Sequence, residues 1–415
     1  MTLRRQQEDI ARRLAVKDTA LKTKHMYDIL STGKIGNIIG GHRDLKYEEF
    51  KSQIDIGTLD KTYKLNLGEG PFKAAYTPSG DAVLYFGGNQ ANLIGTADLN
   101  VTAELKVGDT VHDGTFLHSA GYFALAQTGG LYIYRRDGVE LHVLREHVAV
   151  RRVCFLQDHF LLCSLSEHGQ LRYQDTTVGK LVSDISTKAR VPVLTHDRTN
   201  GVVFTGNRNG VVSLWSPRTS EALAKVLCHR GKISNIKTSG CGQYMYTTAG
   251  LELACWDMRN TFSPVQKVSL LGPAADLAVS DTRKVAVGLR GVVHLFDSEG
   301  VKEMEHSLGR NKVGGVTFMP YEDILAIGTT QGIENIVVPG AGALEYRRDE
   351  NPWVSRAAKR ESEVRRMLEK IPGDMISLDS EIATEMREVF TEEIVPMKLE
   401  TPAGKVRRLM RRHYG

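Results

Sequence analysis

The chain lacks the features that would place it in or across a membrane. Its 415 residues contain no run of about 18 consecutive apolar residues, which a membrane-spanning helix requires. Residues 1–9 also lack the apolar core of a secretory signal peptide. We therefore expect a soluble protein that stays in a reducing compartment.

Sequence patterns of familiar catalytic and nucleotide-binding sites are absent as well. There is no G-x-S-x-G or H-E-x-x-H, and the glycine-rich stretch 33–41 lacks the lysine and hydroxyl order of a phosphate-binding loop. We find no dinucleotide-binding G-x-G-x-x-G and no sign of the polar, metal-competent central channel that an enzymatic propeller requires. The sequence predicts a non-enzymatic protein without a cofactor or metal.

Cysteine is scarce, and its pattern argues against a disulfide framework. The five cysteines form an odd set without a C-x-x-C pair, and all lie in or beside apolar strand patterns. We expect reduced packing residues, with an unrecognised metal site as the open alternative. These cysteines are Cys154, Cys163, Cys228, Cys241 and Cys255.

What the chain does have is a repeat. Five strand-like segments end in the same way, with their penultimate residues Tyr134, Gln174, Trp215, Trp256 and Phe296 separated by 40, 41, 41 and 40 residues. A period of roughly 40 residues, together with Trp256-Asp257 and two further terminal aspartates, is typical of a WD-repeat β-propeller. The predicted fold class is therefore all-β.

Strand signals between turn residues predict seven blades. They begin at about Phe72 and continue to Val338, but the last blade lacks a fourth strand. Residues 63–67 (Tyr-Lys-Leu-Asn-Leu) could supply that strand and so close the ring without an open sheet edge. The predicted domains are a basic N-terminal tail (1–57), the propeller (58–342) and a C-terminal region with a basic tail (343–415).

Helical patterns flank the predicted propeller. Residues 3–30 place Leu3, Ile10, Leu14 and Leu21 on one face of an amphipathic helix. A helix is predicted from 355 to 370, before Ile-Pro-Gly, and a second begins at Ser380 and aligns Ile382, Met386 and Phe390. The propeller should therefore carry helical N- and C-terminal extensions.

Positive charge is concentrated at the two ends. The net charge is +5, but residues 1–24 carry seven Lys/Arg against three acids, and residues 398–415 carry six against one. Such ends suit RNA phosphates, although solvated tails or nuclear targeting would explain them too. The candidate RNA-binding residues are Arg4, Arg5, Arg12, Arg13, Lys405, Arg407, Arg408, Arg411 and Arg412.

Within the repeats, the notable residues have structural interpretations. Trp215 and Trp256 are expected to pack within blades, and His229 to hydrogen-bond to neighbouring strands. Aspartates at strand ends are expected to stabilise turns.

Several segments resemble one protein family in their amino-acid sequence. They include Val212-Ser213-Leu214-Trp215-Ser216-Pro217, the run 320–328 (Pro-Tyr-Glu-Asp-Ile-Leu-Ala-Ile-Gly) and the run 363–372 (Glu-Val-Arg-Arg-Met-Leu-Glu-Lys-Ile-Pro). From about Leu65 to Leu378 the chain resembles the nucleolar WD-repeat subunit of the small-subunit processome, the U-three-associated protein seven or BING-four family. The segment after the propeller is the specific part, because propellers at large do not share it.

The resemblance implies a non-catalytic scaffold in the nucleolus that acts in pre-ribosomal RNA processing and small-subunit biogenesis. Its implied partners are small nucleolar RNA, pre-ribosomal RNA and other processome proteins, including WD-repeat subunits. An alternative is a substrate receptor of a cullin-type ubiquitin ligase, because Trp256-Asp257-Met258-Arg259 matches the W-D-x-R pattern of such receptors.

Overall fold

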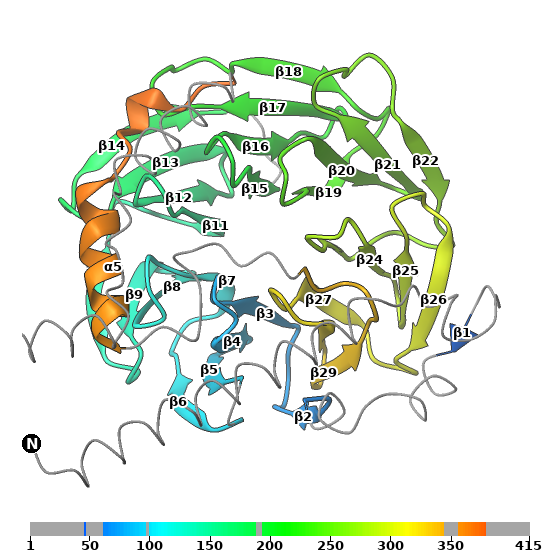
Figure 1. The fold of residues 1–415 in the computed structure, drawn as a ribbon, viewed down its shortest axis with the longest axis horizontal. Helices are drawn as coiled ribbons and strands as arrows, with labels where there is room; N and C mark the ends of the chain where they lie inside the picture. Colours follow the sequence, from blue (N-terminus) through cyan, green and yellow to red (C-terminus); the bar gives the residue numbers. More distant parts are fainter. Residues whose placement is uncertain (1–44, 47–60, 97–98, 188–192, 344–355, 379–415) are drawn as a thin grey trace, which may run out of the picture.

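The computed structural model describes residues 45–46, 61–96, 99–187, 193–343 and 356–378. Seven sheets of antiparallel strands are arranged around a central axis, which confirms the predicted all-β propeller (Figure 1). Each blade is one sheet, and its first strand lies nearest the axis.

The blades follow one another in chain order. Blade 1 contains β3 (Phe72–Tyr76), β4 (Ala82–Gly87), β5 (Gln90–Gly95) and β6 (Val101–Lys106). Blade 2 contains β7 (Val111–Phe116), β8 (Tyr122–Gln127), β9 (Gly130–Arg135) and β10 (Glu140–Leu144). Blade 3 contains β11 (Val150–Leu156), β12 (Leu161–Ser166), β13 (Gln170–Asp175) and β14 (Leu181–Ser186). Blade 4 contains β15 (Leu194–His196), β16 (Val203–Gly206), β17 (Val211–Trp215) and β18 (Ala224–Leu227).

The remaining blades have the same order. Blade 5 contains β19 (Ile233–Thr238), β20 (Tyr244–Ala249), β21 (Glu252–Asp257) and β22 (Gln266–Ser269). Blade 6 contains β23 (Asp276–Val279), β24 (Val285–Gly288), β25 (Val292–Phe296) and β26 (Lys302–Ser307). Blade 7 contains β27 (Val313–Phe318), β28 (Ile324–Thr329), β29 (Gly332–Val337) and, from the other end of the chain, β2 (Lys64–Asn66).

The core lies between neighbouring blades. The second strand of a blade is covered on both faces, and every residue of β4, β12, β16, β24 and β28 is buried. These strands therefore read as continuous apolar or small-residue runs rather than as alternating patterns. The outer strands alternate, as in β22 and β18, because one of their faces meets solvent.

The N-terminal strand closes the ring, as the sequence predicts. β2 pairs with β29 in antiparallel register, with Leu65 opposite Ile333 and Asn66 opposite Gly332. Thr317 Oγ1 also donates to the carbonyl of Ala74 at 2.9 Å, which links the last blade to the first. The two ends of the propeller are thus held together by main-chain pairing within one sheet.

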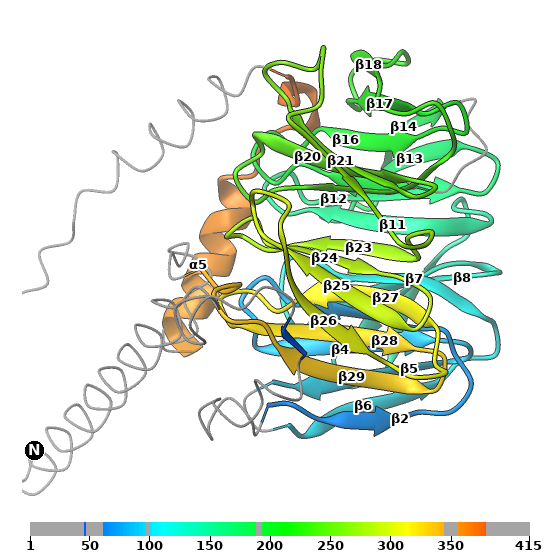
Figure 2. The same ribbon diagram turned by 90° about the vertical axis from the view of Figure 1, so that its right-hand side faces the viewer.

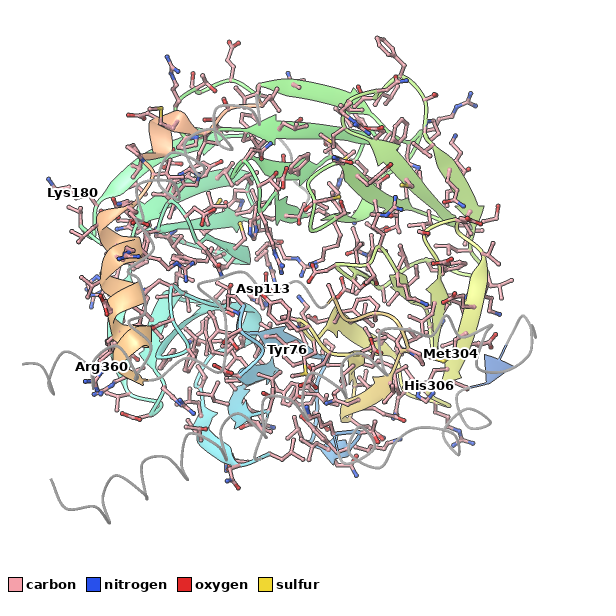
Figure 3. The ribbon with its side chains drawn as sticks, in the orientation of Figure 1. Tyr76, Asp113, Lys180, Met304, His306 and Arg360 are labelled. Carbon is pink, nitrogen blue, oxygen red and sulfur yellow. The ribbon has the colours of Figure 1, made fainter. Side chains whose placement is uncertain are left out.

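A short strand extends blade 6 at its outer edge. β1 (Leu45–Lys46) runs parallel to β26, with Leu45 opposite Met304. Met304 and His306 lie on β26, the strand that β1 extends (Figure 3).

The described C-terminal residues form helix α5 (Arg356–Leu368) and a 3-10 turn η2 (Gly373–Met375). The sequence predicts this helix, and Ile371-Pro372 follows its end. α5 lies across one face of the ring, beside blades 2 and 3 (Figures 1 and 2).

Ring closure can be tested at Gly332. A Cβ at this position would lie 1.8 Å from the Leu65 carbonyl oxygen, so Gly332→Ala forces β2 away from β29. We expect a loss of about 1–3 kcal/mol in the free energy of unfolding, measured by chemical denaturation.

Gly272→Ala is the matched control, because a Cβ there meets nothing within 4 Å. A Gly332→Ala variant as stable as this control would show that the closing strand contributes little.

Candidate interaction surfaces

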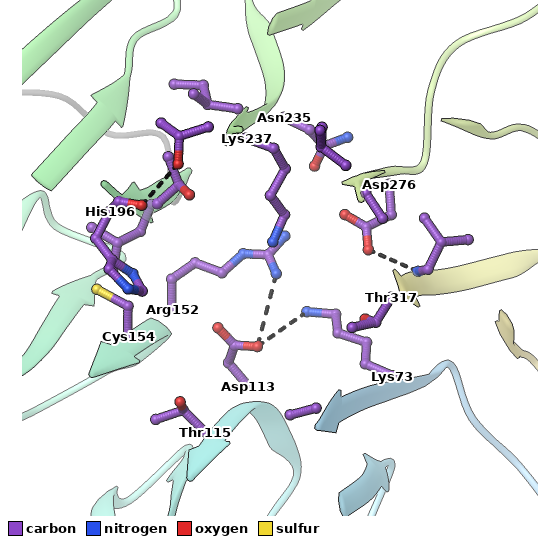
Figure 4. Close-up of a pocket in the computed structure, with 18 of the residues that line it drawn as sticks. Lys73, Asp113, Thr115, Arg152, Cys154, His196, Asn235, Lys237, Asp276 and Thr317 are labelled. Carbon is purple, nitrogen blue, oxygen red and sulfur yellow. Dashed lines mark hydrogen bonds and ion pairs between the residues drawn. The ribbon is translucent and has the colours of Figure 1, made fainter. Parts of the chain in front are cut away.

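The inner strands place charged side chains around a central channel with a volume of about 310 Å³ (Figure 4). Lys73, Asp113, Arg152, Asn235 and Asp276 lie near the start of the inner strands of blades 1, 2, 3, 5 and 6. The channel is therefore polar, a feature that the sequence analysis did not identify. The available signal was the recurrence of polar residues at one position of successive repeats.

The channel carboxylates are used to join blades. Asp113 Oδ2 accepts a hydrogen bond from the Val153 amide at 3.0 Å, and Asp276 Oδ2 accepts one from the Val316 amide at 3.0 Å. Each aspartate thus bonds the main chain of the following blade, 40 residues further along. The buried amide of the next inner strand gains a charged acceptor, which is stronger than a neutral one.

Asp113 also lies between two cations (Figure 4). Its Oδ1 is 3.8 Å from Lys73 Nζ and 3.9 Å from Arg152 Nη1. Burial, together with the charge of Arg152, lowers the pKa of Lys73 to about 8 against the opposing effect of Asp113.

Acid–base chemistry does not follow from this arrangement. Both aspartates are engaged with main-chain amides, and no group of three metal-ligating side chains occurs in the part of the chain that the structure describes. The geometry supports a structural role for the ring of charges.

Tryptophan and histidine form short hydrogen-bonded relays inside the blades. Trp256 Nε1 donates to Thr247 Oγ1 at 3.1 Å, and the same hydroxyl is 2.9 Å from His229 Nε2. In blade 4, Trp215 Nε1 donates to Thr205 Oγ1 at 2.8 Å. Burial lowers the pKa of His229 and favours the neutral ring. The predicted structural roles of Trp215, Trp256 and His229 are confirmed.

The aspartates at strand ends form turns, as predicted. Asp257 Oδ1 accepts from the Arg259 amide at 2.9 Å, and the Arg259 guanidinium folds back onto the same carboxylate at 3.2 Å. The W-D-x-R segment is thus a local turn with an exposed arginine.

The C-terminal segment is docked against the propeller. The Ile371 amide donates to the Asp158 carbonyl at 3.1 Å, and His159 Nδ1 lies 3.1 Å from the Ile371 carbonyl. Lys370 Nζ bonds Asp175 and Thr177 at the end of β13. The side chain of Ile376 is 2% exposed and belongs to the core cluster formed by blades 3, 4 and 5. Ser216 Oγ donates to the Ile376 carbonyl at 2.9 Å.

None of the predicted RNA-binding residues can be placed. Arg4, Arg5, Arg12 and Arg13 lie outside the described residues, as do Lys405, Arg407, Arg408, Arg411 and Arg412. The same holds for the predicted helices at residues 3–30 and from Ser380.

Four of the five cysteines are buried in the blades, as expected, and all five are free thiols. Cys241 is the exception, because its turn between β19 and β20 leaves it exposed. Among the described residues, no helix has the length and apolar character needed to cross a bilayer.

The blade count, the intra-blade relays and the docked C-terminal segment define a WD-repeat β-propeller with an appended helical element. The profile of the BING4CT (NUC141) domain matches residues 302–379, which contain β26 of blade 6, β27 to β29 of blade 7, α5 and η2.

Comparison with curated proteins gives relatives across eukaryotes. The chain is 36% identical over 355 residues to human WD repeat-containing protein 46, covering 82% of this chain and 58% of that protein. It is 36% identical over 362 residues to the U3 small nucleolar RNA-associated protein 7 of Saccharomyces cerevisiae, covering 81% and 65% respectively. The Caenorhabditis elegans WD repeat-containing protein 46 is 32% identical over 360 residues, with 84% and 61% covered.

The predicted resemblance is confirmed, and the chain belongs to the BING-four family, which includes these relatives. It spans about 58–65% of the length of the three relatives named above.

A pH dependence follows from Lys73. Because its folded pKa is about 8 and its unfolded pKa is 10.5, the unfolded chain binds more protons between these pH values, and stability rises with pH across that window. We expect the free energy of unfolding of the native protein, relative to Lys73→Met, to increase by at most about 3 kcal/mol from pH 8 to 10.5. Denaturant titrations at several pH values measure this difference, and a flat difference would contradict the prediction.

The docked segment can be tested at Ile376. Ile376→Ala removes a buried side chain that is 2% exposed, and we expect faster amide hydrogen exchange in residues 370–378. If the segment stays docked until global unfolding, the free energy of unfolding falls by about 2–4 kcal/mol. Leu368→Ala is the control, since Leu368 is 82% exposed and should change neither quantity. Equal exchange in both variants would mean that Ile376 does not anchor the segment.

Proposed function

We propose that the protein is a non-catalytic scaffold of the small-subunit processome, located in the nucleolus. In this role it takes part in pre-ribosomal RNA processing and in the biogenesis of the small ribosomal subunit. The supporting observation is the similarity over 81% of the chain to a yeast protein named for its association with U3 small nucleolar RNA. The match to the BING4CT domain over the family-specific C-terminal segment supports the same assignment.

The geometry favours a binding platform over an enzyme. The channel residues Asp113 and Asp276 join neighbouring blades, and His147 and His229 are buried groups that hydrogen-bond to blade side chains. A rigid ring with many surface loops can bind several partners at once. The proposed partners are other processome proteins, including WD-repeat subunits, together with small nucleolar RNA and pre-ribosomal RNA.

The basic ends are proposed to bind RNA phosphates. The residues are Arg4, Arg5, Arg12, Arg13, Lys405, Arg407, Arg408, Arg411 and Arg412. Since no aromatic stacking pattern accompanies them, we expect them to neutralise the backbone without reading bases.

The C-terminal cations can be tested in the full-length chain. Replacing Lys405, Arg407, Arg408, Arg411 and Arg412 by Gln should flatten the slope of log affinity against log salt by roughly 3 to 4 units for single-stranded RNA. Exchanging Lys for Arg and Arg for Lys at the same five positions is the control, because it keeps the charge and should keep the slope. An unchanged slope in the Gln variant would remove these residues from the RNA interface.

The ligase-receptor alternative rests on Trp256-Asp257-Met258-Arg259, whose arginine is exposed but paired with Asp257. Affinity purification of the tagged protein from cells separates the two functions. We expect pre-ribosomal RNA and processome proteins to co-purify, and an Arg259→Ala variant to keep them. Recovery of a cullin adaptor that is lost in Arg259→Ala, without pre-ribosomal RNA, would contradict the proposed function.

A further inference from the structure

The two faces of the ring differ in what covers them. The turns between the first and second strands, and between the third and fourth strands, lie on the face that carries α5, which we call the docked face (Figure 2). The turns between the second and third strands, and the connections from one blade to the next, lie on the opposite face, which we call the open face. The contacts of Lys370, Ile371 and Ile376 with the propeller are all made on the docked face.

A first group of cations lies on the open face where blades 4 and 5 meet. Arg208 is in the turn between β16 and β17, and Arg230 and Lys232 are in the connection between β18 and β19. The main chain holds these two loops together, because the amides of Cys228 and His229 both donate to the Gly210 carbonyl at 2.9 and 3.1 Å. We call Arg208, Arg230 and Lys232 the first basic cluster.

A second group repeats this construction two blades further on. Arg290 is in the turn between β24 and β25, and Arg310 and Lys312 are in the connection between β26 and β27. The Leu308 amide donates to the Gly291 carbonyl at 2.9 Å, so these two loops are joined as well. We call Arg290, Arg310 and Lys312 the second basic cluster.

The two clusters are related by the repeat. Arg208 and Arg290 are separated by 82 residues, and so are Arg230 and Lys312. Blade geometry therefore presents the two sets of cations in equivalent positions around one rim of the ring.

These six cations have no protein partner in the described part of the chain. All six residues are exposed, and no ion pair or side-chain hydrogen bond of theirs occurs among the described residues. The described turns of blades 4 to 7 on this face, and the connections that join these blades, contain no acidic residue. The next connection, from β2 of blade 7 to β3 of blade 1, contains the exposed Glu69, and Glu252, at the start of β21, lies 3.6 Å from His229. Between the clusters lie the exposed apolar side chains of Leu251 and Leu271, which are 55% and 85% exposed.

The stability of the fold does not explain these six cations, because a neutral polar residue at each exposed position would leave the protein equally stable. They suit an extended polyanion that touches both clusters in turn. Four of the six are arginines, whose planar guanidinium matches phosphate oxygens. The intervening leucines offer apolar contact to sugars or unstacked bases.

We propose that the open-face rim of blades 4 to 7 binds the phosphate backbone of RNA through the two basic clusters. The choice of RNA over an acidic polypeptide rests on the proposed function, whereas the surface itself is defined by the six cations. This interface lies on the propeller and is separate from the basic ends of the chain.

The test measures binding of a fluorescent single-stranded RNA to the full-length protein over a series of salt concentrations. One variant replaces Arg208, Arg230 and Lys232 by Gln, and a second replaces Arg290, Arg310 and Lys312 by Gln. A control variant with the same change in net charge replaces the exposed docked-face residues Arg136, Lys180 and Arg218 by Gln. Because all nine residues are exposed, we expect thermal unfolding of the three variants to match that of the native protein.

Each cluster variant should flatten the salt slope by roughly 2 units, as expected for three phosphate contacts on a single strand, while the control keeps the native slope. Slopes equal to that of the control would overturn the proposal. Labelled poly-glutamate is the second probe: if it binds as tightly as the RNA and loses affinity in the same variants, the surface is an acidic-protein site and the proposal is wrong.

Failure of this RNA interface can be distinguished from failure of the proposed function. If the cluster variants keep the native salt slope while pre-ribosomal RNA and processome proteins still co-purify with the protein, only the RNA interface on the rim is excluded. Repeating the titration in the chain with the five C-terminal cations neutralised separates the rim from the tail, since the two losses should add if they are distinct sites.

Discussion

Closure of the ring by β2 is the constraint on which the rest of the structure depends. Each blade buries its faces against its neighbours, so an open ring would leave two apolar sheet faces and an unpaired edge exposed to water. Pairing of Leu65 with Ile333 places the N-terminal strand in the last blade, and this joins residues that are far apart in sequence. Chain order sets the sequence of the blades around the axis, and this short pairing keeps the last blade beside the first.

Repetition explains why chemically similar groups recur around the ring. A residue at one position of a repeat is carried to an equivalent place in the next blade, so Asp113 and Asp276 bond the following blade in the same way. The same rule produces paired loops at Gly210 and Gly291, where close approach of the neighbouring connection leaves no room for a side chain at Gly210 and little at Gly291. Polar residues in this fold are therefore arranged around the axis or along one rim of the ring, and they are not gathered in a single compact cleft.

Much of the fold was predictable from residue patterns. The missing fourth strand of the last blade pointed directly to residues 63–67, because a sheet edge must be paired, and the structure places β2 there. The channel and the exposure of Cys241 were not predictable in this way. Whether an inner-strand side chain faces the axis depends on bulges such as the one between Val111 and Asp113, which strand periodicity does not reveal. Docking of the C-terminal segment depends on Ile376, one buried apolar residue whose partners are distant in sequence.

Charge and topology together give the two faces different roles. The docked face holds the segment that contains Lys370 through the bond from the Ile371 amide to the Asp158 carbonyl and through the ion pair of Lys370 with Asp175. The open face presents six cations on loops that are hydrogen-bonded to one another, and these cations form no ion pair among the described residues. Since exposed, unpaired like charges repel, their grouping carries an electrostatic cost that a bound anion would relieve. A propeller built this way can hold its own C-terminal segment on one side while the other side stays open to a polyanionic partner.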